Sequence, residues 1–319
     1  MLPESVGIVL WRPINIGVFA VGAYGISSLA SHRYRESVFL PVTILSVLMG
    51  ASAAKLGQMN LIITGLMMLA LVDVTKNNWW LTACLLVLAF ALKPLSIVLI
   101  LLLGVLYPRT IIPFITLLAL LMLIPLLLHD PRYVWEQYQA SVIMLSKAST
   151  VGEQYLNPFA QVFWMMRDFG VTTPETVQLL IRICFALLTL GVCWWIQHRS
   201  TPHTFAIYLY TLSVCYLLLF NPRTENNTYA MLAPALGVFA AWSFQSAGRA
   251  YGYSYLAIIF LYLFSNRIGK WLIGEPTMWL KPLLCIVFLL LVCSQLRQDL
   301  VTGRLALRLA DGRRRGKES

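Results

Sequence analysis

Long apolar runs recur from one end of this chain to the other, and only short polar breaks separate them. Hydrophobic residues make up 59% of its 319 residues, charged residues make up 12%, and the mean hydropathy is +0.75. A water-soluble globule with this composition would be hard to keep in solution. The pattern predicts an all-α fold, a polytopic bundle of membrane helices. Because the runs leave no room for a soluble catalytic domain, any chemistry has to take place at a membrane surface or inside the bundle.

The apolar runs predict roughly eleven membrane segments. The expected ranges are 14–30, 38–54, 58–72, 79–92, 95–107, 111–128, 178–196, 204–220, 228–245, 253–265 and 282–297. A helix needs about 20 residues to cross the hydrocarbon core of a bilayer. The short segments beside Gly57-Gln58 and Lys93-Pro94 are therefore expected to be broken or partly inserted, with their polar joints facing protein or water.

Basic residues predict the orientation of the bundle. We expect a transmembrane domain over 1–298 and a basic tail over 299–319. The positive-inside rule places this tail, which ends in GRRRGK, in the cytoplasm, where it can bind anionic headgroups. Eleven crossings then place the amino terminus outside. Ten basic residues stay on the outer side in this topology, so either the orientation is reversed or some of these cations bind an anionic group.

One long hydrophilic segment, 129–177, is expected to form an extracytoplasmic loop. It contains the amphipathic stretch YVWEQYQASVIML, in which Trp135, Tyr138 and Val142 can lie on the membrane surface. This stretch is either a plain connecting helix or a cap over a site.

Cysteines and short motifs exclude several classes of site. All six cysteines lie in apolar runs, where they are expected to pack as small side chains. The chain has no CxxC or HExxH spacing, so a metal is not expected. Nucleic-acid binding is not expected either, because no aromatic residue is interleaved in the basic tail.

The sequence also bears on the location of the protein. It has no lumenal disulfide framework and only a weak glycosylation sequon at 226–228, so a bacterial inner membrane is the preferred location.

Four polar groups interrupt the apolar pattern, and the predicted topology places all of them on the outer face. They are 55–60, Lys93-Pro94, Asn157-Pro158 with Gln161, and 221–229. Gln58 and Asn60 open an apolar helix, whose amino terminus suits phosphate or sugar hydroxyls. Capping of that helix by a polar side chain is the alternative interpretation.

Lys93 has apolar residues on both sides, and an ionisable group in such a place is a functional hypothesis by default. The alternative is that its side chain extends to the headgroups.

The segment FNPRTENNTYAML, 220–232, is the densest polar cluster of the chain. Arg223 and Glu225 can pair with each other or bind an anion, and Asn226 or Asn227 can cap the helix that follows. Arginine presents a planar fork to phosphate, and amides offer donors and acceptors to sugar hydroxyls. A purely structural turn is the alternative.

The order of these motifs resembles glycosyltransferase family 87, whose members are polyprenyl-phosphate-mannose-dependent mannosyltransferases of the GT-C class. The similar segments are LPESVGIVLWRPIN (2–15), GQMNLII (57–63), LVLAFALKPLSIVLILL (86–102) and NPRTENNTYAMLAPALG (221–237). The resemblance implies a GT-C bundle that moves a sugar, mannose, from a polyprenyl-phosphate donor to a lipid or glycan acceptor on the extracytoplasmic face. Transfer would occur with inversion, and the resemblance implies that no cofactor is needed.

Carried onto this chain, the resemblance implies a set of residues that contact the donor. Candidates for its phosphate are Lys93, Arg223 and Arg132, and candidates for sugar or phosphate oxygens are Gln58, Asn60, Asn226 and Asn227. Family members carry an aspartate, the expected general base, on a first outer loop that precedes the part found here. The catalytic residue is therefore unassigned, and Glu225 is a weak candidate.

Two further hypotheses stay open. A transporter or flippase of lipid-linked sugars would use the same cations and amides, although no internal repeat is visible. A non-catalytic relative that acts with a partner chain is the other, because such a chain could supply the missing aspartate loop.

Overall fold

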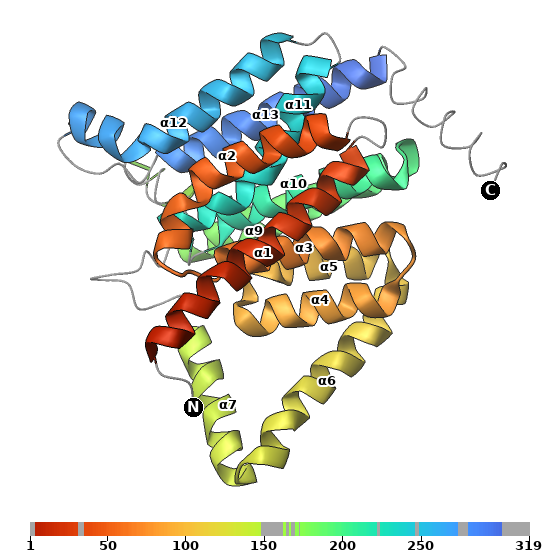
Figure 1. Ribbon diagram of the computed structural model, residues 1–319, viewed down its shortest axis with the longest axis vertical. Coiled ribbons are helices and arrows are strands. Elements are labelled where there is room, and N and C mark those ends of the chain that lie inside the picture. Colours follow the sequence, from red (N-terminus) through yellow and green to blue (C-terminus); the bar gives the residue numbers. More distant parts are fainter. Residues whose placement is uncertain are drawn as a thin grey trace, which may run out of the picture.

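The computed structural model describes residues 4–30, 35–147, 162, 163, 166, 170, 171, 173–221, 224–245, 249–273 and 280–301. Within these residues the chain is a bundle of helices without a strand (Figure 1). The α-helices are α1 Glu4–Ala30, α2 Arg35–Lys55, α3 Asn60–Thr75, α4 Trp79–Leu92, α5 Ile97–Leu106, α6 Ile111–Leu128, α7 Pro131–Lys147, α9 Glu175–Arg199, α10 Pro202–Phe220, α11 Ala233–Gln245, α12 Arg249–Ile273 and α13 Leu280–Val301. Three short 3₁₀ segments join them: η1 Pro94–Ser96, η2 Pro108–Thr110 and η3 Asn226–Leu232.

Successive helices run back and forth, so the connections between them gather at two ends of the bundle (Figure 1). The connections after α2, α4 and α10 lie at one end, which we call the Glu225 end. The connections after α1, α3 and α5 lie at the other, which we call the Lys76 end. The polar groups at 55–60 and 93–94 therefore share one end with the described part of the group at 221–229, as the predicted topology requires.

Six helical segments of the described chain are long and apolar enough to cross a membrane. They are Val9–Ala30, Val38–Lys55, Pro108–Leu128, Glu175–Arg199, Pro202–Phe220 and Leu280–Asp299. The chain is an integral membrane protein. Each of the eleven expected ranges coincides with helix, but eleven crossings are not confirmed. The apolar helices α3 and α4 have 16 and 14 residues, and at about 1.5 Å per residue they fall short of a core of about 30 Å.

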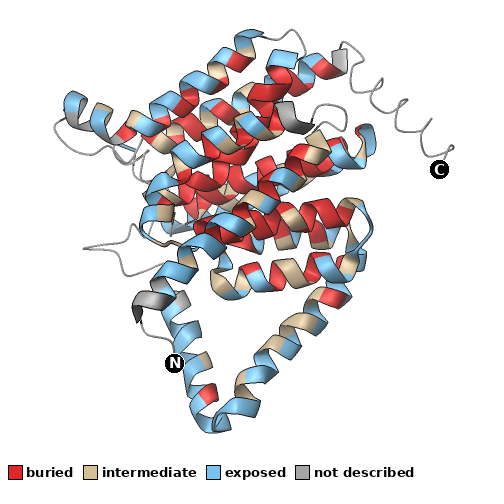
Figure 2. Ribbon diagram, viewed as in Figure 1, coloured by how far each residue is buried: buried red, intermediate tan, exposed pale blue. Residues whose placement is uncertain are grey.

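The centre of the bundle is formed by α3 and α10, which are buried almost throughout (Figure 2). By contrast, α6 belongs to the most apolar span of the six, yet only 6% of that span is buried. An apolar surface of this size is stable only against lipid.

Small residues let α1 and α3 approach closely. A Cβ atom on Gly22 would lie 2.6 Å from the Gly65 carbonyl oxygen, and one on Gly65 would lie 2.5 Å from the Val18 carbonyl oxygen. Close contacts of this kind at glycines are typical of helix pairs in membranes. The contact fixes α1 along α3 and so positions the start of α1 at the Glu225 end.

The amphipathic stretch of the predicted outer loop lies in α7, which forms a V-shaped arm with α6 beside the bundle (Figure 1). Trp135 and Val142 are exposed on α7, and the Tyr138 hydroxyl donates to the Met122 carbonyl at 2.7 Å. Contact of this helix with a membrane surface stays a prediction. The loop residues 148–161 and the basic tail from 302 lie outside the described residues.

All six cysteines lie in described helices, and all are free thiols. Cys193, Cys215 and Cys285 are buried in the core, as expected of packing residues, whereas Cys184 and Cys293 lie on exposed helix faces.

Candidate functional site

The start of α1 is fastened to the turn between α2 and α3 at the Glu225 end. The Trp11 indole N–H donates to the Gly57 carbonyl at 2.8 Å, and Arg12 Nη2 donates to the Lys55 carbonyl at 3.0 Å. Gly57 has a φ of 64°, a left-handed conformation that glycine adopts without strain and that commonly ends a helix. The turn that carries Gln58 is therefore held from outside by two side chains of α1.

Asn15 makes a third connection from α1 to this turn. Its side chain is 2% exposed, donates to the Trp11 carbonyl at 3.0 Å and accepts from the Ile62 N–H at 3.3 Å. Because Ile62 lies in the first turn of α3, where N–H groups have no helical partner, Asn15 caps α3 from a neighbouring helix.

Next to this turn, four side chains form what we call the polar cluster: Gln58, Asn60, Lys93 and Glu225. Lys93 Nζ lies 3.1 Å from Glu225 Oε1, and Gln58 Nε2 donates to Glu225 Oε2 at 3.2 Å. Asn60 Nδ2 donates to Gln58 Oε1 at 3.2 Å. Glu225 is separated by 132 residues from Lys93 and by 167 residues from Gln58. Three distant segments of the chain thus meet at a single carboxylate.

Local structure explains where each member of the cluster sits. Lys93 follows the last residue of α4 and has an extended conformation, because Pro94 disfavours helical geometry in the residue before it. Glu225 precedes η3, and its backbone is fixed by a hydrogen bond from its N–H to the Thr228 hydroxyl at 3.2 Å. Asn60 is 2% exposed and lies behind Gln58, so it acts on the cluster by orienting that amide.

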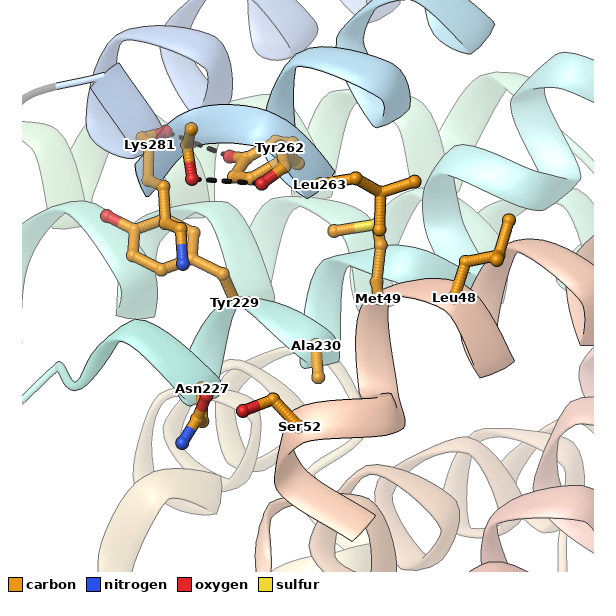
Figure 3. Close-up of a pocket in the computed structure, with 10 residues that line it drawn as sticks. Leu48, Met49, Ser52, Asn227, Tyr229, Ala230, Tyr262, Leu263 and Lys281 are labelled. Atoms are coloured by element: carbon orange, nitrogen blue, oxygen red, sulfur yellow. Dashed lines mark hydrogen bonds between the residues drawn. The ribbon is translucent and has the colours of Figure 1, made fainter. Parts of the chain in front are cut away.

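Beside the polar cluster lies a pocket of about 160 Å³ between α2, η3, α12 and the start of α13 (Figure 3). Its walls include Ser52, Asn227, Tyr229 and Lys281. The Lys281 ammonium lies 5.9 Å from the centre of the Tyr229 ring, within the range of a cation–π contact. Asn227 follows Glu225 by two residues, so this pocket and the polar cluster border the same turn.

Comparison with known proteins decides the family. The model of glycosyltransferase family 87 matches residues 1–222, more than half of the chain. This chain belongs to glycosyltransferase family 87. No curated protein and no solved structure matches it. Family membership and the apolar helices together make the protein a membrane glycosyltransferase.

The family 87 match covers only part of the polar cluster. It includes the WRPIN segment, Gln58, Asn60 and Lys93, and it ends at Pro222. Glu225 lies beyond it, as do Asn226 and Asn227. The inclusion of Glu225 in the site therefore rests on the contacts of this chain.

The remaining residues predicted for this family 87 site have mixed outcomes. Arg132 is exposed near the start of α7, where its Nε lies 3.5 Å from Glu136 Oε1. That end of α7 lies at the tip of the V-shaped arm, away from the bundle that carries the polar cluster (Figure 1). Arg223 lies outside the described residues, as do Asn157, Pro158 and Gln161. Asn226 begins η3, but its side chain is not described. Their roles in binding stay predictions.

Three residues at the Glu225 end of this family 87 chain were not singled out as site candidates. Trp11 and Asn15 position the turn before α3, and Lys281 enters the pocket of Figure 3. The sequence did contain a signal for Lys281, because the dipeptide Lys281-Pro282 repeats Lys93-Pro94 beside another helix end. The contacts of Trp11 and Asn15 depend on helix packing and have no local signal.

The polar cluster contains both a group that can accept a proton and a group that can bind an anion. A carboxylate accepts several hydrogen bonds and an ammonium donates three, and the side chains of Lys93 and Glu225 are 29% and 41% exposed. Both groups therefore retain capacity toward a bound molecule. The described residues contain no group of three or more His, Cys, Asp or Glu side chains placed to hold a metal.

Proposed function

We propose that this chain transfers a sugar, mannose, from a polyprenyl-phosphate donor to a hydroxyl of a lipid or glycan acceptor on the extracytoplasmic face of the membrane. The observation that supports it is the meeting of Lys93, Gln58 and Glu225 at one end of a family 87 bundle. The donor class and the sugar follow from the resemblance to polyprenyl-phosphate-mannose-dependent enzymes.

In the proposed reaction Glu225 is the general base. It takes the proton from the acceptor hydroxyl while the hydroxyl oxygen forms a bond to the anomeric carbon of the sugar. The bond between that carbon and the phosphate oxygen breaks, and its electron pair leaves with the lipid phosphate. Attack opposite to the leaving group inverts the anomeric carbon.

Lys93 stabilises the negative charge that develops on the departing phosphate, since a fixed cation is most effective where charge appears in the transition state. Gln58 holds Glu225 and presents its amide to the sugar, with Asn60 behind it. Arg223, Asn226 and Asn227, which are near Glu225 in the sequence, add phosphate and sugar contacts. The proposal uses no cofactor.

We propose further that the protein lies in a bacterial inner membrane with its carboxyl terminus in the cytoplasm. The Glu225 end then faces outward. Basic residues at or near the Lys76 end, such as Lys76, Arg109 and Arg199, are consistent with a cytoplasmic surface there.

The test is glycosidic bond formation by the purified full chain in liposomes, with radiolabelled polyprenyl-phosphate-mannose and a membrane lipid extract as acceptor. Glu225→Gln and Lys93→Gln should each lower the transfer rate roughly 100-fold or more, the usual scale for a lost general base or charge-stabilising group. Lys76→Gln is the matched control, since it removes the lysine of the 3.5 Å pair with Asp73 at the opposite end. It should leave the rate within about twofold, as for a surface pair that contributes little.

Transfer at the wild-type rate by Glu225→Gln would overturn the assignment of the base. A wild-type protein that moves labelled donor between leaflets without forming a new glycosidic bond would favour a transporter. Transfer that appears only after addition of a second polypeptide would favour the partner-subunit hypothesis.

A further inference from the structure

An open apolar groove of about 600 Å³ lies between α9 and α13. Both helices contain candidate membrane spans, and each packs against α10. Side chains that line the groove include Leu187, Leu188, Val192 and Trp195 of α9 and Leu296 and Arg297 of α13. A separate apolar cavity of about 450 Å³ between α9, α10 and α13 lies toward the Glu225 end, where Phe220 lines it.

The groove opens at the Lys76 end of the bundle. Arg199 ends α9 just before α10 begins, and α10 runs from there to the Glu225 end. The other wall has the same direction, because α13 begins beside Lys281 at the Glu225 end and carries Arg297 near its far end (Figure 1). Tryptophan is enriched at the boundary between hydrocarbon and headgroups, and Trp195 lines this end of the groove. The mouth of the groove therefore lies at headgroup level, on the side opposite to the polar cluster.

The depth of the groove matches one leaflet of a membrane. From Leu187 to Trp195 the wall on α9 extends about 12 Å along the helix axis. One leaflet of a hydrocarbon core of about 30 Å is about 15 Å deep. Gly191 lies midway along this wall and leaves it open, since nothing lies within 4 Å of a Cβ atom added there. An acyl chain can therefore lie along the groove for most of its leaflet.

Two arginines flank the mouth of the groove. Arg297 lines it directly, and the guanidinium carbon of Arg199 lies 5.1 Å from the centre of the Trp195 ring. Both arginines are exposed, and no carboxylate of the described residues forms an ion pair with either. Guanidinium groups bind phosphate in a bidentate geometry. Basic positions between membrane helices on the cytoplasmic side are typical binding sites of anionic headgroups.

We propose that this groove binds one two-chain phospholipid with a net negative headgroup, such as phosphatidylglycerol. One acyl chain lies between α9 and α13, and the phosphate is bound by Arg297 and Arg199. A zwitterionic headgroup is disfavoured, because it would place its own cation beside the two arginines. The inference goes beyond the proposed function, since the groove opens at the end opposite to Glu225 and its lipid is neither sugar donor nor acceptor.

The headgroup is tested by native mass spectrometry of the full chain, delipidated in detergent and titrated with phosphatidylglycerol or phosphatidylcholine. The wild type should retain one phosphatidylglycerol and bind phosphatidylcholine roughly tenfold more weakly. Arg199→Gln and Arg297→Gln combined should lower the affinity for phosphatidylglycerol roughly tenfold or more, to the level of phosphatidylcholine. Lys76→Gln is the matched control and should bind like the wild type, because it removes an exposed cation at the same end but outside the groove.

The chain site is tested at Gly191. Gly191→Trp fills the groove and should weaken binding of both lipids, whereas Gly191→Ala is the matched control and should bind like the wild type. Gly191→Leu obstructs the groove with a smaller side chain, which covers the case in which the tryptophan variant does not fold. Because a ligand that binds only the folded state stabilises it, phosphatidylglycerol should raise the melting temperature of the wild type and of Gly191→Ala but not of Gly191→Leu.

Three results would overturn this inference. Equal affinity of the wild type for phosphatidylglycerol and phosphatidylcholine would remove recognition of charge. Unchanged binding in the double arginine variant, or in both Gly191→Trp and Gly191→Leu, would place the lipid elsewhere on the surface. A wild-type dimer without bound lipid that dissociates in Gly191→Leu would assign the groove to a second copy of the chain. None of these variants alters the polar cluster, so each result leaves the proposed sugar transfer to its own test.

Discussion

Lys93 and Glu225 form an ion pair that is partly open to solvent, with side chains 29% and 41% exposed. Exposed pairs typically contribute less than about 1 kcal/mol to stability. Stability alone therefore gives little reason to bring together two residues 132 positions apart.

At the residue scale, we predict that substitutions of this pair lower activity far more than they change stability. In a double-mutant cycle of Lys93→Met and Glu225→Gln, the coupling in unfolding free energy should stay below about 1 kcal/mol, while each single change lowers transfer roughly 100-fold. Thermal unfolding in detergent micelles and the transfer assay measure the two quantities. A coupling of several kcal/mol together with intact transfer would make the pair a structural one.

At the scale of elements, the crossing of α1 and α3 carries the WRPIN segment to its contacts. A side chain on Gly22 would meet backbone atoms of Gly65, which cannot move aside as a flexible side chain can. The position of Trp11 over Gly57 thus depends on a glycine about three turns away in the same helix.

We predict that Gly22→Ala lowers the melting temperature and the transfer rate together, because α1 must shift away from α3. Gly17→Ala is the matched control on the same helix, since nothing lies within 4 Å of the added Cβ. It should be neutral or slightly stabilising, as alanine favours helix over glycine by up to about 1 kcal/mol. Equal melting temperatures for the two variants would contradict the close crossing.

At the scale of the whole molecule, the alternation of helices separates two ends that we expect on opposite sides of the membrane. In a background with the six native cysteines replaced by alanine, Leu56→Cys should react with an impermeant maleimide in intact spheroplasts. Asn78→Cys should react only after permeabilisation. Both native residues are exposed in connections between helices, so accessibility reports the side of the membrane. The reversed labelling pattern would invert the proposed orientation.

Much of the architecture could be predicted from local patterns. The helical membrane class, the eleven helical ranges and the grouping of 58–60, 93 and 225 at one end all follow from hydropathy and alternation along the chain. The number of crossings could not, because short helices such as α3 are buried within the bundle and need not match the bilayer. The apolar cavity between α9, α10 and α13 could not be predicted either, because its walls come mainly from three separate helices.

By itself the sequence determined a membrane glycosyltransferase of family 87. The lengths of the apolar runs, the polar breaks between them and the family motifs are all properties of contiguous residues. Only the tertiary structure decided that Glu225 takes both Lys93 and Gln58 as partners. These contacts join residues far apart in the chain. Their geometry depends on how closely neighbouring helices approach, and no local pattern encodes that distance.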